Sequence, residues 1–142
     1  MNFDLKGKKA LVTGGSRGIG RAIAVKLAEA GADVAINYLR KVSSADKTAE
    51  LIREQGREAM IVKANVANED HLKNMFDEIK DGFGHLDILV SNAASGVLKP
   101  ALQLTLHHWH WTMDINAGTL IPLSQHFTRI MPKNIKYCKT AL

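Results

Sequence analysis

The 142-residue sequence has very little cysteine and no long apolar run. Cys138 is the only cysteine, which excludes an internal disulfide. No stretch reaches about eighteen consecutive apolar residues, so we expect no membrane-spanning helix. Residues 1–6 lack the basic start and apolar stretch of a secretory signal. Together these absences predict a cytoplasmic protein that does not bind membranes.

Basic residues outnumber acidic ones, but they do not gather into a basic run. The sequence has 19 Lys and Arg against 14 Asp and Glu, for a formal net charge of +5. Because the cations are scattered along segments of helical pattern, we interpret them as solvated helix faces rather than a nucleic-acid groove. The same surplus would favour a pyrophosphate ligand or an acidic carrier protein.

Four apolar segments of strand length alternate with helical patterns along the chain. They lie at residues 10–12, 34–36, 60–62 and 86–90. Their unbroken apolar character is typical of parallel strands that are covered on both faces. The order predicts an α/β protein with a Rossmann-type, doubly wound parallel sheet of order 3-2-1-4. Since such sheets normally have six or more strands, this one is expected to be truncated after about four.

The helical segments have recognisable starts and stops. In the first, Ile19, Ile23 and Leu27 form an apolar stripe, and Gly31 supplies the stop. Pro122 cannot donate a backbone hydrogen bond, so a kink is expected there in the last helix. The helices are predicted at residues 18–30, from Ser43 or Ser44 to Gly56, around residues 72–79, and at residues 105–131.

A glycine-rich loop joins the first strand to the first helix. Gly14 allows a tight turn, Gly18 lets backbone N–H groups approach a ligand, and Gly20 allows close packing of helix on strand. The helix N-terminus then offers free amides and a positive dipole end to an anion such as a pyrophosphate. The loop reads Thr13-Gly14-Gly15-Ser16-Arg17-Gly18-Ile19-Gly20, and its predicted cofactor contacts are Gly14, Ser16, Arg17, Gly18, Ile19 and Gly20.

The spacing Thr-Gly-x-x-x-Gly-x-Gly resembles the short-chain dehydrogenase/reductase family, and two later segments agree. The stretch from Ser91 through Asn92, Ala93 and Ala94 is similar to the Asn-Asn-Ala-Gly segment that follows the family's fourth strand. The resemblance implies that Asn92, Ala93 and Ala94 line the adenosine-ribose and nicotinamide side of a cofactor pocket. It also implies that Asn116, in the long helix, supports a proton relay.

The residues after the second strand indicate the cofactor. NAD-specific members carry an acidic residue there, which binds the ribose hydroxyls and repels a 2′-phosphate. This chain has Leu39 followed by the cations Arg40 and Lys41, and Arg17 lies in the glycine loop. Because arginine binds phosphate through charge-assisted hydrogen bonds, we predict NADPH as the cofactor.

The third strand is followed by another expected cofactor contact. Asn65 and Val66 replace the Asp-Val of the family, whose aspartate accepts a hydrogen bond from the adenine amino group. An asparagine side-chain oxygen can accept the same bond. We therefore expect Asn65 and Val66 to border the adenine.

Two segments resemble one subgroup, the NADPH-dependent enoyl-acyl-carrier-protein reductase III of bacterial fatty-acid synthesis. They are residues 92–100 and 108–117, within a resemblance that covers roughly residues 8 to 131. It implies a homo-oligomer that reduces a trans-2-enoyl thioester on acyl carrier protein. A 3-oxoacyl reductase of the same family and a non-enzymatic nucleotide-binding remnant are the alternatives.

The catalytic serine, tyrosine and lysine of the family follow a fifth strand. Tyr137 and Lys139 are too close together to form the family's Tyr-x3-Lys pair. We therefore expect residues 1–133 to be the NADPH-binding part and residues 134–142 to be a tail that departs from the pattern, through truncation or a frameshift. Alone, the chain is expected to be inactive.

The histidines near the start of the long helix do not predict a metal site. His107, His108 and His110 do not share one helix face, and no cysteine or acidic residue completes a ligand set with them. We expect surface or groove histidines and no bound metal.

Overall fold

A computed structural model describes residues 4–133, which fold around a four-stranded parallel sheet of order β3-β2-β1-β4. The centres of the two inner strands are apolar and fully buried, as in parallel strands that lie between helices. This confirms the predicted Rossmann-type sheet and its order. The strands are β1 (Lys9–Val12), β2 (Asp33–Tyr38), β3 (Ala59–Lys63) and β4 (Ile88–Val90).

The order in which successive strands are added to the sheet reverses beside β1. The chain passes from β1 to β2 and β3 on one side and then crosses to β4 on the other, so that Leu11 faces Ala35 in β2 and Leu89 in β4. This reversal creates a topological switch point at the carboxyl ends of β1 and β4. Ligands of open α/β sheets bind at such points.

The fourth strand is shorter and less covered than predicted from residues 86–90. Leu86 is fully buried but precedes the strand, and Asp87 binds the backbone N–H of Lys9 through its carboxylate at 2.9 Å. Within the described chain β4 is an edge strand, and its three residues are only half-buried.

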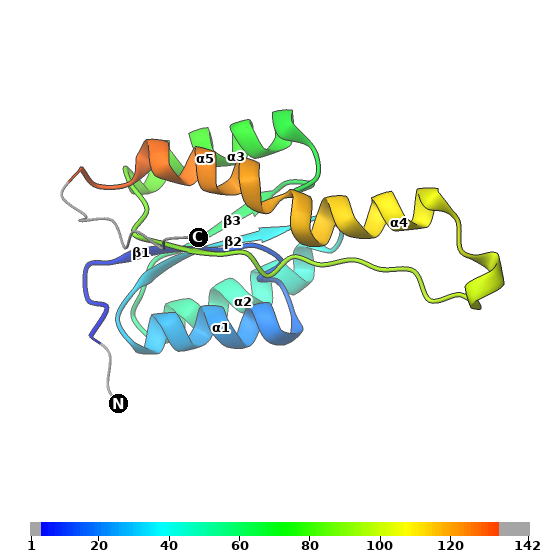
Figure 1. The fold of residues 1–142 in the computed structure, drawn as a ribbon. Coiled ribbons are helices and arrows are strands. Elements are labelled where there is room, and N and C mark those ends of the chain that lie inside the picture. Colours follow the sequence, from blue (N-terminus) through cyan, green and yellow to red (C-terminus); the bar gives the residue numbers. More distant parts are fainter. Residues whose placement is uncertain (1–3, 134–142) are drawn as a thin grey trace.

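Two helices cover each face of the sheet (Figure 1). On one face lie α1 (Gly18–Glu29) and α2 (Val42–Glu54), and on the other lie α3 (Glu69–Phe83) and α5 (Leu120–Ile130). The predicted stops at Gly31 and Gly56 are confirmed, since both glycines have positive φ. Between residues 4 and 133, no helix is both long and apolar enough to cross a membrane.

Small residues form the fully buried face of α1, while Ile23 and Leu27 of the predicted stripe pack beside it against the core. Gly20, Ala24 and Ala28 are buried, whereas Ile19 is 74% exposed. Their small size lets the helix approach the sheet closely, so the larger apolar side chains are displaced to its flanks and, at Ile19, into the open.

The start of α2 also differs from the prediction. Lys41 occupies the N-cap position, and Ser43 and Ser44 lie inside the first turn. A serine at the N-cap was expected because its hydroxyl can satisfy a free amide. Here Ser44 instead offers its backbone carbonyl to Arg21 and Thr48.

The predicted helix 105–131 is divided. It consists of α4 (Leu106–Met113), a π-helical turn η2 (Asp114–Gly118) and α5, and it follows the short 3-10 helix η1 (Ala101–Gln103). The widened turn is closed by the Thr119 N–H, which donates to the Asp114 carbonyl at 3.0 Å. The irregularity therefore precedes Pro122, which lies in the first turn of α5, where a missing N–H costs little. The segment from η1 through α4 extends beyond the sheet (Figure 1).

Candidate nucleotide-binding site

The glycine loop leaves β1 and enters α1 through positions that favour glycine. Gly14 and Gly18 have φ of 64° and 55°. A Cβ on Gly20 would lie 2.3 Å from the Gly14 carbonyl oxygen and 2.5 Å from Asn92 Nδ2. The close approach predicted for Gly20 is therefore present, and its immediate partner is the loop itself.

The N-terminus of α1 has the chemistry of an anion site. The first amides of a helix have no carbonyl partner within it, and Arg17 at the N-cap makes no capping bond with its side chain to any described residue. No described atom outside the loop lies within 4 Å of where a Cβ on Gly18 would stand. An open helix start of this kind can accept a phosphate group.

Thr13 and Asn92 join the two strands at the switch point. Thr13 Oγ1 accepts hydrogen bonds from the Asn92 and Ala93 N–H groups, at 2.9 and 3.0 Å. Asn92 Nδ2 donates in return to the Thr13 carbonyl, at 2.9 Å. The predicted segment Asn92–Ala94 is thus held directly beside the glycine loop. Thr13 had no assigned role in the sequence, although it opens the loop motif.

Asn37 holds the other side of the glycine loop, and it had no assigned role in the sequence. It is 2% exposed; its Oδ1 accepts from the Gly14 N–H at 3.3 Å, and its Nδ2 donates to the Ala64 carbonyl at 2.9 Å. It therefore joins the ends of β1, β2 and β3. The signal available in the sequence was a lone polar residue at the end of an apolar strand, because a buried amide must find partners.

The residues predicted to select the cofactor lie at this same carboxyl edge. Arg17 is exposed at the start of α1, and Leu39 and Arg40 are exposed in the connection from β2 to α2. Ile19 and Leu39 expose 74% and 46% of their surface. Exposed cations beside exposed apolar side chains suit a ligand that carries both phosphate and flat rings.

The predicted adenine contacts follow β3. Asn65 Oδ1 accepts from the Ala67 N–H at 3.1 Å, and its second lone pair can accept another bond. Val66 borders a cavity of about 270 Å³ between the start of α3 and the η2 turn. Both residues belong to the same end of the sheet as the glycine loop.

Asn116 lies in the π-helical turn and holds the segment after β4. Its Oδ1 accepts from the Ser95 N–H at 2.9 Å, and its Nδ2 donates to the Ser95 carbonyl at 2.8 Å. Trp111 Nε1 donates to Ser95 Oγ at 3.0 Å. These bonds fix the backbone directly beyond Ala94.

One histidine of α4 has a local structural role. His108 completes a capping box with Thr105. No group of three metal-ligating side chains occurs within residues 4–133.

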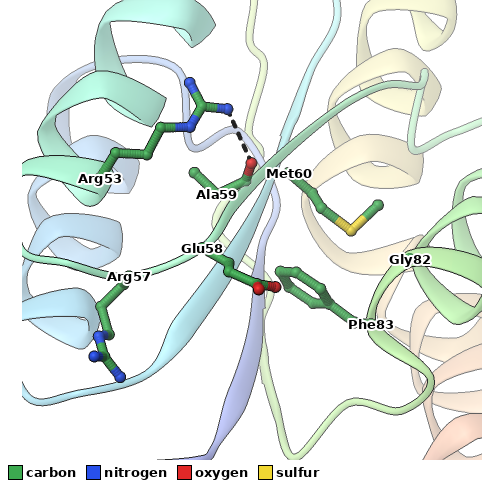
Figure 2. A pocket seen from close by; sticks show the side chains of 7 residues that line it. All are labelled: Arg53, Arg57, Glu58, Ala59, Met60, Gly82 and Phe83. Carbon is green, nitrogen blue, oxygen red and sulfur yellow. Dashed lines mark hydrogen bonds between the residues drawn. The ribbon is translucent and has the colours of Figure 1, made fainter.

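A second and larger cavity lies elsewhere. It has a volume of about 420 Å³ and lies at the amino end of β3, lined by Arg53, Met60, Phe83 and their neighbours (Figure 2). Because parallel strands present their functional loops at the carboxyl end, this cavity does not belong to the candidate site.

The switch point, the glycine loop and the amide-lined helix start define a nucleotide-binding α/β protein. Residues 8–136 match the family model of the short chain dehydrogenases. The chain therefore belongs to the short-chain dehydrogenase/reductase family.

Two curated relatives illustrate the range of the family. Glucose 1-dehydrogenase 2 of Bacillus subtilis is 36% identical over 96% of this chain and 54% of its own length. The 3-oxoacyl-[acyl-carrier-protein] reductase FabG of Staphylococcus epidermidis is 44% identical over 73% of this chain and 42% of its own length. The chain spans about half the length of the curated relatives it matches.

Solved structures agree with the fold. A short chain dehydrogenase from Burkholderia cenocepacia in complex with NADP has a TM-score of 0.85 and 41% identity, over 90% of this chain and 52% of that one. A blue fluorescent protein from a metagenomic library, in complex with NADPH, has a TM-score of 0.83 and 34% identity, over 91% and 53%.

Proposed function

We propose that this chain binds NADPH as the nucleotide-binding part of a short-chain reductase. The observation that carries the proposal is the pairing of an amide-lined loop with Arg17 and Arg40, where the end of β2 presents no acidic residue. The loop amides would hold the pyrophosphate, and the two arginines would hold the 2′-phosphate. When bound, NADPH supplies the hydride.

The remaining contacts follow from the strand ends. Ile19 and Leu39 would cover the adenosine, with Asn65 and Val66 beside the adenine. Asn92, Ala93 and Ala94 would border the nicotinamide side, because Thr13 holds them at the switch point. Asn116 would support proton transfer by fixing the Ser95 backbone beside this segment.

For the substrate we propose a trans-2-enoyl thioester on acyl carrier protein. Residues 92–100 and 108–117 support this choice through their resemblance to the enoyl reductase subgroup. The second candidate is a 3-oxoacyl thioester, which the 44% identity to the Staphylococcus epidermidis reductase favours. Cytoplasmic location stays a prediction from the sequence.

The complete reaction needs more than the described residues provide. The 142-residue sequence contains no Tyr-x3-Lys pair, and Tyr137 lies outside the described residues. A positioned general acid contributes about 10²–10⁴-fold to rate. We therefore expect the chain alone to bind NADPH but to oxidise it at a rate close to background. If the purified chain turned over robustly, that expectation would be wrong.

We further propose that the protein is a homo-oligomer. Apolar side chains on α4 and at the start of α5 are exposed, among them Leu106 at 76%, Trp109 at 60% and Ile121 at 68%. Large apolar side chains exposed in such number are typical of an interface. Sedimentation of the chain should show a dimer or larger species that Trp109→Glu shifts towards monomer.

A binding and a substrate experiment test the proposal. Calorimetric titration of the purified chain should give tighter binding of NADPH than of NADH, and no binding of either would refute the cofactor assignment. For the substrate, a full-length relative that shares residues 92–100 and 108–117 is assayed with crotonyl and acetoacetyl thioesters. Reduction of the keto substrate alone would select the 3-oxoacyl alternative.

A further inference from the structure

The Arg21 side chain links three parts of the nucleotide site. From α1, its Nη2 donates to the Ser16 carbonyl at 2.7 Å and to the Ser44 carbonyl at 3.1 Å. Its Nε donates to Thr48 Oγ1 at 2.9 Å. One planar group thus spans the glycine loop and the first two turns of α2.

Thr48 completes this arrangement from α2. Its side chain is fully buried, and Oγ1 lies 3.0 Å from the Ser16 carbonyl oxygen and 3.1 Å from that of Ser44. Having one hydroxyl hydrogen, it donates to one of these carbonyls at a time while it accepts from Arg21. We call Arg21 and Thr48, with the carbonyls of Ser16 and Ser44, the α1–α2 clamp.

Neutral oxygens stabilise the charge of Arg21. Across the described residues, no carboxylate forms an ion pair with it. A guanidinium has donors in a fixed, planar fork. Its bonds to two carbonyls and a hydroxyl therefore set the direction in which each oxygen points, and an ammonium group could not reproduce that geometry.

The clamp acts on the two segments that carry the exposed arginines. In a trans peptide the C=O and the following N–H point in opposite directions, so fixing the Ser16 carbonyl also fixes the N–H of Arg17. Ser44 lies four residues after Arg40, in the first turn of α2. The clamp thereby joins the backbone at Arg17 to the helix start that follows Arg40.

We propose that Arg21 and Thr48 are positioning residues that set the selectivity for NADPH over NADH by holding the Arg17 and Arg40 segments in one arrangement. Neither residue needs to touch the cofactor. The inference rests on the proposed NADPH binding, and it assigns part of the selectivity to residues that face away from the exposed surface of the loop.

The test is calorimetric titration of the full 142-residue chain with NADPH and with NADH. Thr48→Val removes the hydroxyl at similar volume, and Thr48→Ser retains it. We expect Thr48→Val to weaken NADPH by about tenfold, equivalent to about 1.4 kcal/mol, and NADH by less than about twofold. Thr48→Ser should restore the wild-type ratio of the two dissociation constants.

Arg21→Lys provides a second variant, should Thr48→Val fail to fold. It keeps the charge but loses the fork, so the NADPH-to-NADH ratio should fall as in Thr48→Val. Arg53→Lys is the matched control, because Arg53 also donates to a backbone carbonyl, that of Ala59, but at the other end of the sheet. It should change neither affinity.

The outcomes separate the two proposals. Equal losses for both cofactors in Thr48→Val and Arg21→Lys, or no loss in either, would overturn the role of the clamp while leaving NADPH binding in place. A wild-type chain that binds neither cofactor would overturn the proposed function itself.

Discussion

Replacing Gly20 with alanine tests the packing of the glycine loop at its tightest point. The added Cβ would stand 2.3 Å from the Gly14 carbonyl oxygen and 2.5 Å from Asn92 Nδ2. Since Cβ contacts under 3.0 Å are essentially never found, the distance between the Cβ and this oxygen must increase by at least 0.7 Å. Backbone cannot rotate away as a side chain can, so the loop or helix α1 must shift.

The size of the effect follows from three contributions. Alanine in a helix is favoured over glycine by about 0.8–1.0 kcal/mol. Against this, overpacking costs about 1–3 kcal/mol. Displacing Asn92 Nδ2 weakens its two bonds, to the carbonyls of Thr13 and Gly14, at about 1 kcal/mol each. We therefore expect Gly20→Ala to lower the free energy of unfolding by about 1–4 kcal/mol.

Urea unfolding followed by circular dichroism measures this loss, and Gly82→Ala is the matched control. Gly82 also lies in a helix, but its added Cβ would meet only the end of the Met60 side chain, at 2.7 Å. That flexible end can move, so the control should be neutral or more stable by up to about 1 kcal/mol. A Gly20→Ala chain as stable as the Gly82→Ala chain would refute the close approach.

Three further predictions concern the site and the surface. Replacing Arg17 and Arg40 together with alanine should weaken NADPH by about 100-fold and NADH only slightly, because two charge-assisted bonds to the 2′-phosphate are lost; equal weakening in calorimetry would show that they only hold the loop. Thr13→Val removes the acceptor of two half-buried amides, those of Asn92 and Ala93, at a cost of up to about 1–3 kcal/mol each, so an unchanged urea midpoint would contradict the bridging role of Thr13. On α3 the hydrogen bond from Lys73 to Asp77 lowers the pKa of Asp77 and raises the pKa of Lys73. Any contribution of the pair to the free energy of unfolding is therefore present above the ordinary aspartate pKa and is lost as the pH falls through the lowered aspartate pKa. It is also lost as the pH rises through the raised lysine pKa. Because both groups are exposed, Lys73→Met should raise the Asp77 pKa towards its ordinary value in an NMR titration while leaving the urea midpoint at pH 7 unchanged. A marked drop in the midpoint would argue against this.

Local patterns were sufficient to predict the sheet and the loop. Continuous apolar segments indicated parallel strands, and their alternation with helices limits the topology to few arrangements. Gly14, Gly31 and Gly56 all have positive φ, and glycine in a sequence indicates such positions because it adopts this conformation readily. The predicted cofactor residues consequently fell at one edge of the sheet.

The contacts that rigidify the site could not be predicted in this way. Thr13 and Asn92 are 79 residues apart, and Arg21 and Thr48 are 27 apart. Nothing in the periodicity of either helix shows that their side chains meet. The buried face of α1 was predicted only in part: Ile23 and Leu27 pack against the core, but Ile19 is exposed and the fully buried residues are Gly20, Ala24 and Ala28.

The division of the last helix was predicted only approximately. Proline gave a reason for a kink at Pro122, but the irregular turn is Asp114–Gly118. Within this turn Asn116 makes a tertiary contact, because its side-chain oxygen and nitrogen both bind the Ser95 backbone. The helical pattern of the sequence alone does not indicate that Asn116 contacts Ser95.

The most direct test of NADPH binding at the carboxyl edge is an amide NMR titration of the isotopically labelled chain. NADPH should shift the resonances of residues 14–20, 39–40, 65–66 and 92–94, and NADH should shift them at higher concentration. The amides around the cavity lined by Arg53, Met60 and Phe83 should stay unchanged. Shifts confined to that cavity, or no shifts at saturating NADPH, would contradict the assignment of the nucleotide site.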